Sequence, residues 1–232
     1  MPLLHDWNLT EAEAVAVQRR LAPLVDTASP LGPVGTLAGC DIAYDTTSNA
    51  AWAAVVVLTF PDLVEVERAV VREEVTFPYI PGLLSFRECP PLLSAFARLR
   101  KLPDVVILDA QGIAHPRKFG SACHLGLWLG VPAVGCAKTW LCGEHPVVGP
   151  TAGDLAPLTM DGESVGAVVR SATNVRPVYV SPGHRVDLSG AVRLVTATLS
   201  GYRHPTPTRA AHIAANAART AAGIELGNGE TG

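Results

Sequence analysis

Three acidic residues stand where regular elements of this sequence end or begin. Asp109 comes directly after Val105-Val-Ile-Leu108, an apolar run typical of a buried strand. Asp41 similarly follows the apolar segment Leu37-Ala-Gly-Cys40, and Glu88 lies at the opening of a predicted helix. A strand that ends on a carboxylate delivers it to the edge of a sheet, where ligands can reach it. Three such acids converging on one spot would provide the oxygen ligands that a hard cation such as Mg²⁺ requires.

Two further residues have side chains suited to contact with a nucleic acid. Lys138 follows the apolar run Val134-Gly-Cys-Ala137 and is also expected at a strand end, where its ammonium group would stabilise phosphate charge or orient water. Tyr79 lies between Pro78 and Pro81, which stiffen its loop. A rigid, exposed aromatic ring can wedge into a duplex and fill the gap left by an extruded base. The alternatives are a surface lysine whose stem packs on the protein and a tyrosine that anchors its own loop.

The elements that must position these residues follow a mixed α/β order. Thr10-Glu-Ala-Glu13 has the pattern of a capping box and predicts a helix that runs to about Val25. The expected order continues with strands at 35–44, 50–60 and 64–75, a helix at 85–100, a strand at 104–108, a helix at 118–129, a strand at 133–137, a hairpin of 164–170 and 177–181, and helices at 188–199 and 208–224.

Three antiparallel strands followed by a parallel βαβ unit, with one acid on the first strand and another on the fourth, match the ribonuclease H-like plan. We therefore predict an α/β fold whose mixed central sheet is flanked by helices. Residues 1–232 should form a single domain, with a frayed C-terminal tail from about residue 226.

Composition restricts the class of protein. The 232 residues are 48% hydrophobic and 17% charged, which describes a globular chain with a large core. The net charge of −3 argues against a protein that coats nucleic acid non-specifically, since such proteins usually have a pI above about 9. The five cysteines show no zinc-ligand spacing and suggest free thiols in a reducing compartment. No targeting signal or membrane-length apolar segment is visible, so we expect a soluble, cytoplasmic protein with no membrane partner.

Five motifs in register along the chain resemble those of the endonuclease V family: Phe77-Pro-Tyr-Ile-Pro-Gly-Leu-Leu-Ser-Phe-Arg-Glu88, Asp109-Ala-Gln-Gly-Ile-Ala-His-Pro-Arg117, Gly135-Cys-Ala-Lys138, Ser181-Pro-Gly-His184 and Pro207-Thr-Arg209. The resemblance covers about residues 37–212. It implies a monomeric, Mg²⁺-dependent repair endonuclease, with Mn²⁺ able to substitute, that acts on DNA containing deoxyinosine. Such an enzyme would hydrolyse the second phosphodiester bond on the 3′ side of the lesion and leave 3′-hydroxyl and 5′-phosphate ends.

The resemblance also implies roles for individual residues. Asp41 and Asp109 match direct metal ligands, and Glu88 would complete the metal site. Lys138, His115 and His212 would be further catalytic residues; phosphate contact, water positioning and support of a second metal all stay open for the two histidines. The wedge and the pocket for a flipped hypoxanthine would be formed by Tyr79, Ile80, Pro81, Gly82, Leu84, Ala110, Gly112 and Leu141. For His184 an ordering role in its loop is an equal alternative, and Arg87, Arg117, Lys118 and Arg209 are either contacts to the nucleic acid backbone or ordinary surface charges.

Two positions depart from the family pattern. Ala110 stands where the family usually has glycine, and its methyl group would crowd the pocket or restrict the backbone. Trp140 stands where arginine is usual, so a phosphate contact is lost or replaced by stacking on a base. Both changes bear on lesion selectivity. Two other functions remain open: a ribonuclease specific for inosine-containing RNA, and a non-catalytic module that binds deaminated nucleic acid.

Overall fold

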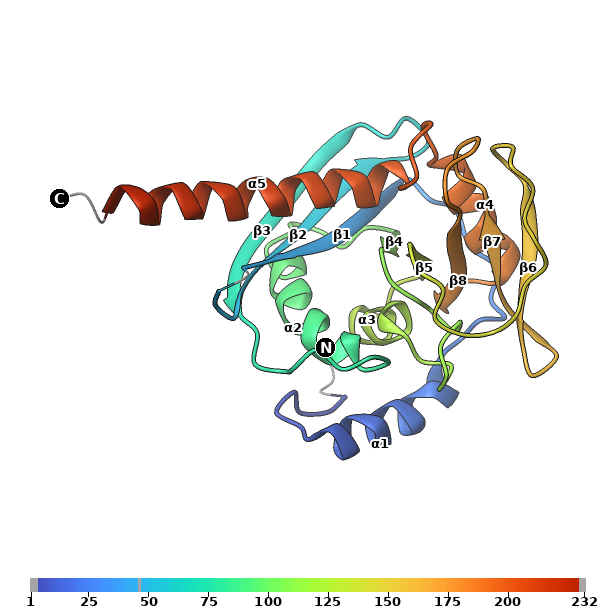
Figure 1. The fold of residues 1–232 in the computed structure, drawn as a ribbon, viewed down its shortest axis with the longest axis horizontal. Helices are drawn as coiled ribbons and strands as arrows, with labels where there is room; N and C mark the ends of the chain where they lie inside the picture. The colour runs from blue at the N-terminus through green and yellow to red at the C-terminus, as the bar shows by residue number, and fades with distance from the viewer. Residues whose placement is uncertain (1–3, 46, 230–232) are drawn as a thin grey trace.

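The computed structural model describes residues 4–45 and 47–229, which form an eight-stranded mixed sheet with helices on both faces (Figure 1). Its strands run in the spatial order β3-β2-β1-β4-β5-β8-β7-β6. Their bounds are β1 Thr36–Tyr44, β2 Ala50–Thr59, β3 Glu65–Glu74, β4 Val105–Leu108, β5 Ala133–Ala137, β6 Leu155–Met160, β7 Glu163–Val169 and β8 Val178–His184.

The strand pairing confirms the ribonuclease H-like plan. β1, β2 and β3 form an antiparallel meander, whereas β4 pairs in parallel with both β1 and β5. β2 lies inside the meander, and its run of alanine and valine is buried on both faces. Beyond β5 the sheet becomes antiparallel again through β8, β7 and β6. The predicted hairpin corresponds to β7 and β8.

Two helices cover each face of the sheet. α2 (Leu84–Phe96) and α3 (Ser121–Leu129) bury their apolar sides against one face, in a core with residues of β1, β2 and β4. α4 (Leu188–Ala197) and α5 (Thr206–Gly229) cover the other face, where α5 crosses the meander (Figure 1). α1 (Glu11–Leu21), which continues as the 3₁₀ helix η1 (Ala22–Leu24), packs outside α2 and α3 through a smaller apolar cluster. The predicted capping box is present, since Thr10 and Glu13 exchange hydrogen bonds.

The prediction from the sequence missed one strand and misplaced several helix ends. β6 was not predicted because Pro157 interrupts it; an edge strand tolerates proline because one of its sides needs no ladder hydrogen bonds. α3 begins after position 118, where the prediction started it, because Lys118 has a positive φ of 49° and Gly120 is the N-cap. α2 ends at Phe96 rather than near residue 100.

α5 continues past the predicted end at residue 224 to Gly229. Fraying from about residue 226 stays a prediction, and residues 230–232 lie outside the described part of the chain. All five cysteines are free, and Cys40 and Cys136 are buried in the core as expected for small apolar residues. None of the described helices is long and apolar enough to cross a membrane.

Candidate active site

The pairing of β1 with β4 brings the two aspartates together. The parallel register ends at Cys40 opposite Leu108, so Asp41 and Asp109 are the next residues on adjacent strands. Asp109 follows the last residue of its strand, as predicted. Asp41 does not end a strand, because β1 continues to pair with β2 as far as Tyr44. It is nevertheless accessible, since the neighbouring strand β4 has already ended.

Glu88, on α2, is close enough to Asp41 and Asp109 to be affected by their charges. Burial, followed by the charges of Asp41 and Asp109, raises the pKa of Glu88 to about 8. Burial also raises the pKa of Asp41, although its hydrogen bond with His212 opposes this. The charges of Lys138 and Arg87 oppose the rise of the Glu88 pKa only in part, and carboxylate oxygen atoms gathered in this way are suitable ligands for a hard divalent cation.

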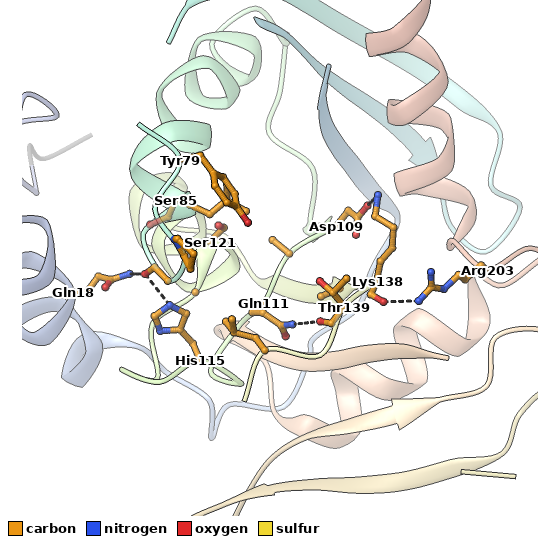
Figure 2. Close-up of a pocket in the computed structure, with 17 residues that line it drawn as sticks. Gln18, Tyr79, Ser85, Asp109, Gln111, His115, Ser121, Lys138, Thr139 and Arg203 are labelled. Carbon is orange, nitrogen blue, oxygen red and sulfur yellow. Dashed lines mark hydrogen bonds and ion pairs between the residues drawn. The ribbon is translucent and has the colours of Figure 1, made fainter. Parts of the chain in front are cut away.

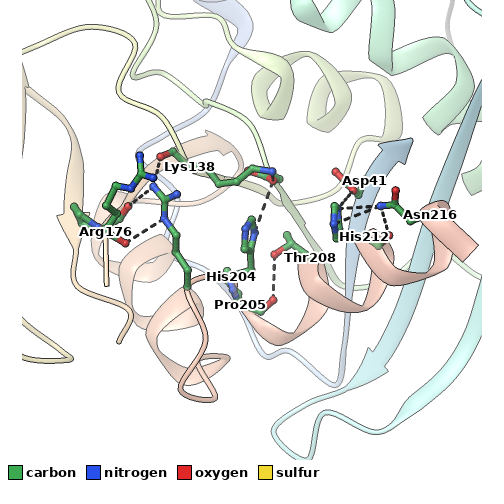
Figure 3. Close-up of polar contacts among 11 residues, drawn as sticks. Asp41, Lys138, Arg176, His204, Pro205, Thr208, His212 and Asn216 are labelled. Carbon is green, nitrogen blue, oxygen red and sulfur yellow. Dashed lines mark hydrogen bonds and ion pairs between the residues drawn. The ribbon is translucent and has the colours of Figure 1, made fainter. Parts of the chain in front are cut away.

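The acids do not form a closed metal cage in this arrangement. Among the described residues, no three His, Cys, Asp or Glu side chains are placed to enclose an ion. Asp109 Oδ2 instead lies 2.6 Å from Lys138 Nζ (Figure 2). Asp41 Oδ2 lies 2.7 Å from His212 Nδ1 (Figure 3). The chemistry of the donors fits Mg²⁺, but the metal site of Asp41, Glu88 and Asp109 stays a prediction.

Lys138 directly follows β5, as its sequence context predicted. Arg203 fixes this strand end by donating to the backbone carbonyl of Lys138 (Figure 2). It also donates to the carbonyls of Pro177 and Arg176, at 3.1 Å each. The ammonium group of Lys138 pairs with Asp109 at the rim of the pocket described below.

Two histidines approach the aspartates from the other side. His212, on α5, contacts Asp41, and Asn216 donates to the His212 carbonyl at 2.9 Å. His204 was missed by the sequence reasoning; its Nδ1 lies 3.8 Å from Asp109 Oδ2, and its ring is stacked on His212 with centroids 6.4 Å apart. Burial is the main influence that lowers the pKa of His204. Its place just before the Pro207-Thr-Arg209 motif was the signal that could have identified it.

A pocket of about 330 Å³ opens beside Asp109 and Lys138 (Figure 2). Of the residues predicted for substrate binding, Tyr79, Pro81, Gly82, Leu84, Ala110 and Leu141 line it, together with His115. Tyr79 is 70% exposed, so its ring is free to contact a large ligand. Ile80 instead packs partly against the apolar cluster around α1, and Asp41, Glu88 and His212 lie outside the lining.

Gly112 also lies outside the pocket lining. Its N–H donates to Ser181 Oγ at 2.8 Å, and an added Cβ would come within 2.0 Å of the Pro182 carbonyl oxygen. Close packing of this loop against β8 therefore explains why residue 112 has no side chain. Ala110, by contrast, lines the pocket and is nearly buried.

His115 is held by two hydrogen bonds that use both of its ring nitrogens. The Arg117 N–H donates to Nδ1 at 3.1 Å, so Nε2 carries the hydrogen and donates to the Gly82 carbonyl at 2.9 Å. Burial lowers the pKa of His115 to about 4, which keeps the ring neutral near pH 7. This geometry leaves no free ring nitrogen for a phosphate, a water molecule or a metal.

The other basic side chains named from the sequence all have partners within the protein. Arg87 donates to the Phe77 carbonyl at 2.7 Å, Lys118 pairs with Glu163 at 2.5 Å, and Arg209 lies 3.9 Å from the centroid of the Tyr202 ring. His184 Nδ1 accepts from the Asp26 N–H at 3.3 Å, which agrees with the loop-ordering alternative.

Gln111 is a pocket residue that the sequence reasoning did not single out. Its Nε2 donates to the Thr139 carbonyl at 2.8 Å, and this fixes the orientation of the amide. Its Oε1 is buried without a hydrogen-bond partner among the described residues. A ligand donor is therefore the natural partner of this oxygen. Outside the lining, Trp140 is 56% exposed, and its indole N–H donates to the Gly143 carbonyl at 3.1 Å.

A ribonuclease H-like sheet that presents a cluster of acids and a lysine beside an open pocket defines a nuclease-type active site. The sequence profile of the endonuclease V family matches residues 19–213. The endonuclease V of Roseiflexus castenholzii is 46% identical over 215 residues, which cover 93% of this chain and 96% of the relative. The chain belongs to the endonuclease V family and is an enzyme that hydrolyses nucleic acid.

Solved structures agree with this assignment. The crystal structure of endonuclease V from Streptomyces avermitilis superposes with a TM-score of 0.87 at 41% identity and covers 93% of this chain and 96% of that one. Endonuclease V from Ciona intestinalis, in complex with DNA containing an inosine followed by a ribo-adenosine, shares the fold with a TM-score of 0.80 at 23% identity, over 90% of this chain and 97% of that one.

Proposed function

We propose that this protein is a Mg²⁺-dependent endonuclease that recognises deoxyinosine in DNA and hydrolyses the second phosphodiester bond on its 3′ side, leaving 3′-hydroxyl and 5′-phosphate ends. The observation that carries the proposal is the convergence of Asp41, Glu88 and Asp109 beside Lys138, at the rim of a 330 Å³ pocket. Membership of the endonuclease V family supports it, and the Ciona protein of the same fold binds inosine-containing DNA.

Asp41, Asp109 and Glu88 would hold the metal, which when bound would activate water and neutralise charge on the phosphate. Lys138 would contribute a second positive charge at the same phosphate, because its ammonium group is already beside Asp109. His212 would orient the Asp41 carboxylate through their 2.7 Å contact. Mn²⁺, which also prefers oxygen ligands, would substitute for Mg²⁺.

Recognition of the lesion would take place in the pocket. An extruded hypoxanthine would enter between the Gly82 loop and Ala110, and Tyr79 would occupy the gap that it leaves in the duplex. Hypoxanthine carries a hydrogen on N1, where adenine has only a lone pair. Gln111 Oε1, which has no partner in the part of the chain that the structure describes, would supply an acceptor in this pocket, as a base with a ring N–H requires.

The test is cleavage of an end-labelled duplex with a single deoxyinosine, in Mg²⁺ and in EDTA, with the product mapped to the nucleotide. A Mg²⁺-dependent cut one nucleotide beyond the lesion is expected. A matched RNA containing inosine tests the ribonuclease alternative, which would be correct if only the RNA were cut. Tight binding to both substrates without any cleavage would instead identify a binding module.

A further inference from the structure

One backbone carbonyl, that of Gly82, receives hydrogen bonds from three side chains. Gln18 Nε2 donates to it at 2.9 Å, His115 Nε2 at 2.9 Å and Arg117 Nη2 at 2.7 Å. A carbonyl oxygen has two lone pairs, so three donors exceed what an ordinary turn needs. Gly82 has a φ of 80°, a conformation that glycine adopts without strain.

Gln18 links these donors to one another. It lies on α1, is 1% exposed, and accepts at Oε1 from Arg117 Nε, so the orientation of its amide is fixed. Its Nε2 also donates to the Phe119 carbonyl at 3.1 Å. Gln18 and His115 both point to this one acceptor in the pocket wall (Figure 2). One buried amide thus connects α1, the turn at Gly82 and the loop that leads into α3.

Gly82 ends the loop that carries Tyr79, and only two residues separate them. Tyr79 is 70% exposed, so its own ring does little to fix the loop. Burial of a polar side chain is costly unless its hydrogen bonds are made, and Gln18 makes all of its contacts to this site. The loop that carries Tyr79 is therefore in direct contact with a helix that lies outside the sheet.

We infer that Gln18 is a positioning residue for lesion recognition, which holds the Tyr79–Gly82 loop in place through the Gly82 carbonyl. The inference rests on the proposed function of that loop in recognising an extruded base. Gln18 lies just before the segment matched by the family profile, which begins at residue 19.

The first test needs no substrate. Amide hydrogen exchange over residues 78–83 is compared in the wild type, Gln18→Met and Gln18→Glu. Gln18→Met removes every side-chain hydrogen bond of residue 18. Gln18→Glu keeps an acceptor for Arg117 and loses both N–H donors, so it serves if the apolar variant does not fold. Pro78 and Pro81 have no amide hydrogen, so the amide to follow is that of Leu83, which donates to the Ile80 carbonyl at 2.9 Å. Its exchange should become about tenfold faster in either variant, the equivalent of one lost hydrogen bond. Unchanged exchange in both would overturn the inference.

The matched control is Arg20→Met on the same helix. Arg20 is exposed and donates to a single backbone carbonyl, that of Leu4, at 3.0 Å. The same change of a long polar side chain to methionine should therefore leave exchange over residues 78–83 at the wild-type rate. Faster exchange in this control would show that any damage to α1 loosens the loop, and would overturn the specific role of Gln18.

The second test measures whether Gln18 acts through Tyr79. Gln18→Met should slow single-turnover cleavage of a deoxyinosine duplex by about tenfold, and adding it to Tyr79→Ala should slow cleavage no further. Losses that multiply in the double variant would show that Gln18 acts independently of Tyr79, against the inference. A wild-type protein that does not cut inosine would refute the proposed function, while the exchange experiment would still decide the role of Gln18.

Discussion

His115 should give the protein a pH-dependent stability whose direction follows from its surroundings. Burial, the largest influence, lowers the pKa of His115 to about 4 in the folded protein, whereas an ordinary histidine has a value of 6.5. Between these values the unfolded chain binds a proton that the folded protein does not. The free energy of unfolding therefore falls as the pH falls through this window, and is unaffected by His115 above it.

The size of the effect can be worked out for one substitution, His115→Asn. Each pH unit within the window changes the free energy of unfolding by about 1.4 kcal/mol, so His115 costs the wild type about 2 kcal/mol between about pH 6.5 and about pH 5. Near pH 7.5 the variant should be less stable by about 1–3 kcal/mol, because Gly82 loses a donor and the Arg117 N–H loses its acceptor. It should recover about 2 kcal/mol of that deficit near pH 5.

The assay is urea unfolding followed by circular dichroism at both pH values in metal-free buffer. Other titrating groups, such as Glu88 with its raised pKa, are present in both proteins and cancel in the difference. His145→Asn is the control, because His145 is exposed, bonds to the neighbouring Pro146 carbonyl and otherwise lies edge-on to the Tyr179 ring, far from the Gly82 carbonyl. The difference in the free energy of unfolding between wild type and His115→Asn should change between the two pH values. If it stays the same, the reasoning about His115 is refuted.

Four further predictions concern cleavage of a deoxyinosine duplex. Asp41→Asn or Asp109→Asn should abolish cleavage while the circular dichroism spectrum stays unchanged; normal cleavage by either variant would remove it from the metal site. Lys138→Ala should lower the single-turnover rate about 10²-fold by loss of charge at the phosphate, and a rate near wild type would contradict that role. Tyr79→Ala should weaken cleavage about tenfold or more without changing the Mg²⁺-induced rise in melting temperature, so a loss of that rise would argue against the wedge. Ala110→Gly should raise cleavage of deoxyxanthosine relative to deoxyinosine, because removal of the methyl group enlarges the pocket; an unchanged ratio of rates would show that residue 110 does not limit the lesion.

Local sequence patterns predicted most of the fold because the decisive signals lie within single elements. The capping box at Thr10 and the apolar runs of β1, β2, β4 and β5 each identify their element without reference to the rest of the chain. β6 could not be identified from its own residues. The burial of its alternate residues depends on β7 beside it, and Pro157 suggests a loop when that partner is unknown.

The residues of the candidate site likewise differ in whether their own element predicts their position. Asp109 and Lys138 could be placed because each follows a buried strand, whereas His204 belongs to a connection between helices and gains its position only from the packing of α4 and α5 on the sheet. A side chain that hydrogen-bonds to a backbone group far away in the sequence is even harder to identify from the sequence.

Gln18 shows why such contacts escape sequence reading. On α1 it occupies a buried position of an amphipathic helix, where a single glutamine is an ordinary exception to an apolar stripe. Its hydrogen bonds join residues 64 and 101 positions away in the chain, Gly82 and Phe119, and so depend on the complete fold. The motifs of the sequence identify the groups that would contact the nucleic acid. Of the three side chains that bond to the Gly82 carbonyl, His115 and Arg117 belong to a motif, whereas Gln18 lies outside all of them and could be found only from the complete fold.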